Sequence, residues 1–205
     1  MNDKWLSVAM RLQSIAQAGL QYGKDPYDIA RYTELWEIAA QLLAERTDLP
    51  PEKIHAVFCN ETGYQTPKLD TRAAVFSEGK ILLVHEADGT WALPGGWCDV
   101  DQSVASNAEK EVLEEAGLRV RAVRLIALQD WRLHNVHNYA HGVIKAFVLC
   151  ENLGGAFAEN PETTEARFFE KTALPAELAT QRSSKEQILL CFSAYENPDM
   201  PTQFD

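Results

Sequence analysis

The sequence lacks long apolar runs, and this excludes several classes of protein. None of its hydrophobic stretches reaches the about 18 residues that a membrane-spanning helix needs. The amino terminus also lacks the basic-then-apolar order of a signal peptide. We therefore expect a soluble protein with a cytoplasmic location and no membrane partner. Its 205 residues suffice for one well-buried core with a smaller appendage.

Cysteines and basic residues are also scarce. The four cysteines lie far apart and form no C-x-x-C pair: Cys59, Cys98, Cys150 and Cys191. This spacing provides neither a zinc knuckle nor a redox motif, and free thiols are the simplest interpretation. With 19 Lys and Arg against 30 Asp and Glu, the formal net charge is -11. Such a charge repels polyanions, so we do not expect DNA as a partner.

The first part of the chain has the apolar spacing of a helical module. Apolar residues over positions 5–20 recur every three or four residues, which predicts an amphipathic helix. Asp25 followed by Pro26 is typical of a helix cap and a first-turn proline, and the same spacing continues over positions 29–43. Two prolines at the start of positions 50–58 predict a short third helix.

Beyond this module the pattern changes to strands with helices between them. Runs at positions 71–76 and 81–85 predict a hairpin around Glu78, Gly79 and Lys80. Further strands are expected at positions 120–128, 143–149 and 167–169. One helix is predicted over positions 103–116, ending at Gly117, and a last helix after the capping-box pattern of positions 183–186. We expect two domains, over residues 1–62 and 63–205.

The most informative chemistry lies on the middle helix and at the glycines before it. At about 100° per residue, Glu111, Glu114 and Glu115 fall on one side of the helix, within an arc of about 100°. Like charges at this spacing repel one another, so a counter-ion is expected. Mg²⁺ binds through a few carboxylates while keeping waters and phosphate oxygens in its shell. Gly95 and Gly96 allow close approach of the backbone, so a carbonyl of either could add a ligand.

The spacing of these residues resembles the Nudix box, G-x5-E-x7-R-E-U-x-E-E-x-G-U, in which U is aliphatic. The matching positions are Gly96, Glu111, Val112, Glu114, Glu115, Gly117 and Leu118. Gln102 stands in place of the first glutamate and Lys110 in place of the arginine. Lysine pairs as a point charge but cannot form the bidentate fork of arginine. The departures therefore concern the bracing of the loop, whereas the metal-binding acids are all present.

The resemblance extends from about Leu69 to Phe192 and implies a fold, an activity and a cofactor. The fold is an α+β, Nudix-like α/β/α sandwich with a mixed sheet, preceded by a small all-helical domain. The activity is a pyrophosphohydrolase that uses Mg²⁺, with Mn²⁺ as the alternative, to split a nucleoside diphosphate linked to a group X.

A second resemblance concerns the helical module, which is similar to the amino-terminal domain of Nudix enzymes like CDP-choline pyrophosphatase. It is carried by Asp25, positions 27–29, positions 31–32 and positions 60–64. CDP-choline is therefore the first substrate that we expect, and ADP-ribose or another nucleotide sugar is the alternative.

The resemblance also implies roles for single residues. Glu111, Glu114 and Glu115 would hold the metal together with the carbonyl of Gly95 or Gly96, and the three glutamates would take part in catalysis. A distal acid that binds metal or activates water would be Glu165 or Glu162, although an exposed acidic loop is an equal alternative.

Three further residues are candidates for substrate binding: Arg72 at a phosphate, Trp97 at the base and His134 in a substrate loop. For Arg72 and Trp97, packing in the core or on the surface is the more frequent role of such residues. His134, His137 and His141 resemble a transition-metal set, but their loop context argues against one.

Other classes of function stay open. A nucleotide sensor that no longer hydrolyses its ligand is compatible with Gln102 and Lys110, and a structural adaptor would use only the helical module. Trp5 and Trp36 exceed what so small a module needs to bury alone, so we expect a homodimer through the amino-terminal helices.

Overall fold

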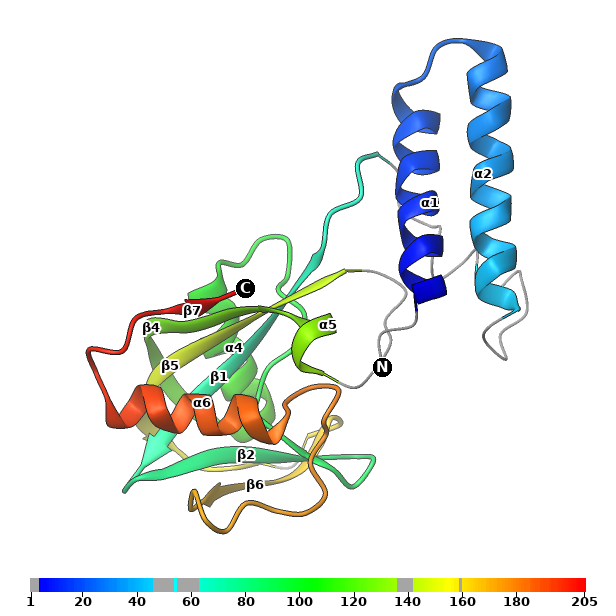
Figure 1. Ribbon diagram of the computed structural model, residues 1–205. Coiled ribbons are helices and arrows are strands. Elements are labelled where there is room, and N and C mark those ends of the chain that lie inside the picture. The colour runs from blue at the N-terminus through cyan, green and yellow to red at the C-terminus, as the bar shows by residue number, and fades with distance from the viewer. Residues whose placement is uncertain (1–3, 46–53, 55–62, 136–141, 159) are drawn as a thin grey trace. The chain divides into compact units, whose positions relative to one another are not determined.

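The computed structural model describes residues 4–45, 54, 63–135, 142–158 and 160–205, which fall into two compact units (Figure 1). One unit contains the described residues up to Pro67, and the other contains those from Lys68 onward, Gly142 excepted. The sequence placed the boundary slightly earlier, between residues 62 and 63. Among the described helices, none is long and apolar enough to cross a membrane. The cytoplasmic location stays a prediction.

The first unit contains two of the predicted helices side by side, α1 (Lys4–Tyr22) and α2 (Pro26–Ala44) (Figure 1). Asp25 caps α2 as expected, because its side chain accepts hydrogen bonds from the backbone N–H groups of Tyr27 and Asp28 at 2.9 and 3.1 Å. Most residues buried in these two helices are small or apolar: Ala9, Ala16, Ala39, Ala40 and Leu43. Gln13 and Gln17 of α1 are buried as well, and the Nε2 of Gln13 donates a hydrogen bond of 2.6 Å to the Oε1 of Gln17.

The two tryptophans of this unit differ in exposure. Trp36 is partly buried against the small core of the unit, whereas Trp5 is about half exposed. Homodimerisation through these helices stays a prediction. The predicted third helix over positions 50–58 lies outside the described residues, apart from the buried Ile54.

The second unit is built on a mixed sheet, as expected. Its strand order is β3-β2-β1-β5-β4-β7, and β6 pairs with β2. The strands are β1 (Lys68–Ser77), β2 (Lys80–Glu86), β3 (Trp91–Ala92), β4 (Leu118–Asp130), β5 (Val143–Gly155), β6 (Thr163–Phe169) and β7 (Gln203–Phe204). β1 runs antiparallel to β2 and parallel to β5. The turn between β1 and β2 uses Glu78 and Gly79, both at positive φ, which matches the right-handed twist of a two-residue hairpin.

Helices cover both faces of this sheet, which confirms the α/β/α sandwich. Alternate side chains of β1 point to opposite faces. Ala74 packs in a core with Ile188 and Phe192 of α6 (Lys185–Glu196). Val75 packs in a second core with residues of α4 (Val104–Ala116), namely Ala108, Val112 and Ala116. α4 therefore presents its remaining side to the glycine segment that precedes it.

Helix ends agree closely with the sequence, with one correction. Ser103 caps the start of α4, and Gly117 ends it at φ 66, where a Cβ would lie 2.2 Å from a backbone oxygen. The capping box of α6 is formed by Ser184 and Gln187, so the expected box over positions 183–186 was wrong by one residue. Ser183 is instead buried and accepts a hydrogen bond of 3.3 Å from the backbone N–H of Leu93. Three short elements were not predicted: β3, β7 and α5 (Trp131–His134).

Candidate active site

The glycine segment before α4 is fixed along β1. Backbone hydrogen bonds of 2.8 to 2.9 Å join segment 94–98 to β1. One of them runs from the N–H of Thr71 to the carbonyl of Gly96 at 2.8 Å. Gly95 has φ 144, and a Cβ there would lie 1.9 Å from the carbonyl oxygen of Thr71. Only glycine fits at this position, and the loop is held close to the strand.

Two of the three predicted acids lie against this loop. Glu115 is 3% exposed, and its Oε2 accepts a hydrogen bond of 2.8 Å from the N–H of Gly95. Glu111 is 8% exposed, and a Cβ on Gly96 would lie 3.0 Å from its Oε2. Glu114 lies on the open side of α4, with 57% of its side chain exposed. In the described part of the chain, no three His, Cys, Asp or Glu side chains form a ready-made metal cage.

The electrostatics of the buried acids favour a cation. Burial raises the pKa of Glu115 to about 8; nearby Arg72 and the Gly95 N–H lower it, while Glu86 and Glu111 raise it further. Burial likewise raises the pKa of Glu111, against the opposing effect of Lys110. Buried carboxylates that repel one another gain from a nearby cation, and hard oxygen donors are what Mg²⁺ and Mn²⁺ prefer. The chemistry of the carboxylates of Glu111 and Glu115 therefore fits such an ion.

Arg72 is buried and is already paired with a carboxylate. Its guanidinium donates two hydrogen bonds of 2.7 Å to the carboxylate of Asp70 and one of 3.3 Å to the carbonyl of Leu93. It also acts electrostatically on Glu115. In the structure, the hydrogen bonds of Arg72 therefore go to Asp70 and to the backbone at Leu93. Its contact with phosphate stays a prediction.

The sequence analysis missed one acid that acts electrostatically on Glu115, namely Glu86, and the two basic residues that support it. Glu86, at the end of β2, is buried and forms an ion pair of 2.6 Å with Arg182. Burial raises the pKa of Glu86, and Arg182 and Arg72 oppose the rise. The buried Lys145 donates hydrogen bonds of 2.7 and 2.6 Å to the carbonyls of Gln181 and Arg182, so it fixes the backbone that carries Arg182. Only the position of Glu86 directly after an apolar run could have signalled this group.

The two distal acids lie in different surroundings. Thr163, at the start of β6, donates a hydrogen bond of 2.6 Å to the carbonyl of Glu115, which ties this turn to the last turn of α4. Glu162 is the residue before this anchor, is exposed, and acts electrostatically on Glu86. Glu165 lies two residues further along β6, where it forms an ion pair with Arg167.

The other substrate-binding candidates lie in the same unit. Trp97 follows the glycines and is 44% exposed. His134 ends α5, and its Nε2 lies 2.8 Å from a carboxylate oxygen of Asp205. His137 and His141, which completed the alternative zinc set, lie outside the described residues.

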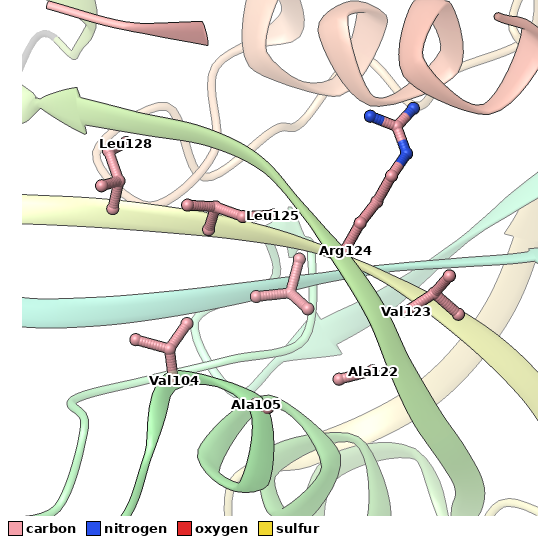
Figure 2. Close-up of a pocket in the computed structure, with 8 residues that line it drawn as sticks. Val104, Ala105, Ala122, Val123, Arg124, Leu125 and Leu128 are labelled. Atoms are coloured by element: carbon pink, nitrogen blue, oxygen red, sulfur yellow. The ribbon is translucent and has the colours of Figure 1, made fainter. Parts of the chain in front are cut away.

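A separate hollow beside the first turn of α4 does not have the chemistry of a metal site. It has a volume of about 320 Å³ and lies between α4 and β4 (Figure 2). Its lining is almost wholly apolar: Val104, Ala105, Ala122, Val123, Arg124, Leu125, Leu128 and Val148. No carboxylate lines it, so it offers no ligands to a divalent cation.

Comparisons with known proteins agree with this geometry. Residues 66–190 match the NUDIX domain, and residues 3–58 match a domain described as UDP-X-like, N-terminal oligomerisation domain. YjhB of Bacillus subtilis (strain 168), provisionally assigned as an ADP-ribose pyrophosphatase, is 39% identical over 206 aligned residues, which cover 100% of this chain and 99% of that protein.

Solved structures give the same result. The crystal structure of an ADP-ribose pyrophosphatase from Streptococcus suis 89-1591 is 51% identical, with a TM-score of 0.64, and covers 68% of this chain and 100% of that one. The crystal structure of a UDP-X diphosphatase is 32% identical, with a TM-score of 0.65, and covers 98% of both chains. The chain therefore belongs to the Nudix hydrolase family.

Proposed function

We propose that this chain hydrolyses the pyrophosphate bond of a nucleoside diphosphate linked to a group X, giving a nucleoside monophosphate and phospho-X. The observation that carries the proposal is a pair of buried carboxylates on α4, Glu111 and Glu115. Both lie against the glycine loop that precedes this helix. The proposed cofactor is Mg²⁺, with Mn²⁺ as the alternative.

ADP-ribose is the first substrate that we propose. YjhB and the Streptococcus suis protein are both named for ADP-ribose, and another solved relative is named for UDP-linked compounds. These names favour ADP-ribose or a UDP-linked compound over CDP-choline, which the sequence had placed first.

Three glutamates of α4 would bind Mg²⁺. The buried carboxylates of Glu111 and Glu115 would be two of its ligands, and the exposed carboxylate of Glu114 would be the third. Gly95 is the better carbonyl ligand, because the carbonyl of Gly96 already accepts a hydrogen bond from Thr71. A bound Mg²⁺ offsets phosphate charge and makes a coordinated water more acidic.

The chain's own groups set the geometry around that ion. The Gly95 N–H fixes one oxygen of Glu115, and Arg72 balances part of the buried negative charge. Glu162 is our candidate for the group that accepts the proton of the attacking water. It is exposed and adjoins the Thr163 anchor, whereas Glu165 is engaged by Arg167.

The amino-terminal helices would serve assembly. The matching domain is described as an oligomerisation domain, which supports an oligomer, and we propose a homodimer. Exposed apolar side chains on α1 and α2 offer the surface for it: Ile15, Tyr22, Tyr27 and Ile38.

The test is a substrate panel with product identification. Purified protein is incubated with ADP-ribose, UDP-glucose and CDP-choline in the presence of Mg²⁺, and products are followed by ³¹P NMR. We expect AMP and ribose 5-phosphate from ADP-ribose, and no turnover in EDTA. Preference for CDP-choline would restore the first choice of the sequence. Binding of a nucleotide without hydrolysis would replace the enzyme by a sensor.

A further inference from the structure

The two departures from the Nudix box fall on residues that hold the loop before α4. Gln102 is uncharged, so it cannot balance Lys110 as the family's glutamate balances its arginine. The Nζ of Lys110 instead lies 3.1 Å from the Oδ2 of Asp99, a residue of the loop itself. It also lies 3.3 Å from Glu111 and 3.2 Å from Glu114. Asp99 thus supplies the carboxylate that position 102 lacks.

A buried side-chain amide makes a second connection to the same loop, and this one is shielded from solvent. Asn107 is fully buried and lies one helical turn before Glu111 on α4. Its Nδ2 donates hydrogen bonds of 2.8 Å to the Oγ1 of Thr71 and 3.3 Å to the carbonyl of Trp97. Its Oδ1 accepts a hydrogen bond of 3.3 Å from the N–H of Asp99. One side chain therefore joins the helix, the strand and the loop.

We propose that Asn107, together with the Asp99–Lys110 ion pair, replaces the glutamate–arginine brace of the Nudix box in this chain. Asn107, Asp99 and Lys110 are all positioning residues, because they act on the metal site through the loop and, in the case of Lys110, also through its ion pairs with Glu111 and Glu114. Trp97 directly follows the glycines and Asp99 lies two residues further along the same loop, so fixing them helps to hold Gly95 against Glu115 and Gly96 against Glu111.

The two connections should differ in strength. Lys110 is partly exposed and shared among three carboxylates, so solvent and salt weaken each of its ion pairs. Asn107 is shielded from water, and its removal takes away the amide donor that the buried hydroxyl of Thr71 accepts from. We therefore assign the larger share of the bracing to Asn107.

The test measures metal affinity separately from stability, in the full-length protein and without nucleotide. Mn²⁺ binding is followed by electron paramagnetic resonance of the free ion, and the melting temperature is recorded for each variant. Asn107→Ala should weaken Mn²⁺ binding by about tenfold, and Lys110→Gln by a smaller factor, while Lys110→Arg should bind as the wild type does.

The matched control is Gln187→Ala on α6. Gln187 is equally buried and also bonds both a side chain and a backbone N–H, at 3.0 Å to Gln129 and 2.8 Å from Ser184. It should lower the melting temperature to a similar extent without changing Mn²⁺ affinity. Equal affinity in Asn107→Ala and the wild type, or equal losses in Asn107→Ala and Gln187→Ala, would overturn the proposal. If Asn107→Ala does not fold, Lys110→Gln against Lys110→Arg decides, and equal affinity in that pair would overturn it.

This inference rests on the proposed function only in one respect, namely that the metal site serves nucleotide hydrolysis. If the wild type binds Mn²⁺ but splits no member of the nucleotide panel, the proposed function fails while the brace is still tested by affinity. If the wild type binds no Mn²⁺, both fail together. In an active enzyme, Asn107→Ala should lose turnover at low Mg²⁺ and recover it at saturating Mg²⁺, with an unchanged KM for the nucleotide.

Discussion

Replacing Glu115 by glutamine should make the metal-free protein more stable and the enzyme inactive. Glutamine keeps the size of the side chain and an oxygen that accepts the 2.8 Å hydrogen bond from Gly95. It removes a carboxyl group whose ionisation the fold opposes, because burial raises the pKa of Glu115 from 4.5 to about 8. The same charge is what a bound Mg²⁺ requires, so turnover should fall by orders of magnitude.

The size of the stability change follows from this pKa. A carboxyl whose pKa is raised in the fold stabilises it below the unfolded pKa, and this contribution is lost as the pH rises toward the folded value. In EDTA, wild-type stability should therefore fall between pH 4.5 and about 8. One pKa unit corresponds to about 1.4 kcal/mol, so the loss at pH 7 amounts to about 3 kcal/mol at most. Glu115→Gln lacks this loss.

The assay is urea denaturation in EDTA and in Mg²⁺, at several pH values, together with turnover of ADP-ribose. Mg²⁺ should stabilise the wild type and leave Glu115→Gln unchanged. Glu114→Gln is the matched control: its side chain is exposed, so its stability in EDTA should stay within about 0.5 kcal/mol of the wild type. A Glu115→Gln protein that is less stable in EDTA at pH 7 and keeps wild-type turnover would refute the reasoning.

Four further predictions concern the loop, the distal acids, a buried lysine and the assembly. Gly95→Ala should cost about 2–4 kcal/mol in urea denaturation because its Cβ would lie 1.9 Å from a backbone oxygen. Gly79→Ala, in open space at φ 77, should cost about 1 kcal/mol; equal costs would contradict the close approach. Glu162→Gln should lower kcat with ADP-ribose by about 100-fold and Glu165→Gln by much less, and the reverse order would move the proton acceptor to Glu165. Burial lowers the pKa of Lys145 from 10.5 to about 7, so the neutral amine is favoured in the fold. The stabilisation that comes from the lowered pKa of Lys145 is lost as the pH falls from 10.5 toward 7. Between pH 7.5 and 9, the free energy of unfolding of the wild type should therefore rise relative to that of Lys145→Met by about 1 kcal/mol per pH unit. A difference that does not change with pH would contradict this prediction. Light scattering at micromolar concentration should report a dimer, and a monomer would remove the proposed role of the helices.

Local signals predicted the frame of the site. Ser103 and Gly117 mark the two ends of α4 in the sequence, and both act as caps in the structure. The three- and four-residue spacing on α4 placed Val112 correctly in the core below the sheet. Such features depend on neighbours within one helical turn, which the sequence displays directly.

Long-range pairings could not be predicted in the same way. Glu86 is buried because it pairs with Arg182, 96 positions later in the sequence. The capping box of α6 begins one residue later than predicted because the hydroxyl of Ser183 accepts a hydrogen bond from the backbone N–H of Leu93, 90 positions away. The three glutamates share one arc of α4, yet Glu114 is exposed because only the inner edge of that arc meets the glycine loop. Periodicity gives the side of a helix, whereas the partner on that side comes from the fold.

The central claim is that the buried carboxylates of α4 and the glycine loop together form the binding site for a divalent cation. Crystals of the full-length protein soaked in Mn²⁺ and measured at the manganese absorption edge test this claim directly. We predict an anomalous peak bounded by Glu111, Glu115 and the backbone of Gly95. A peak elsewhere, or these side chains separated by solvent alone at saturating Mn²⁺, would contradict the account.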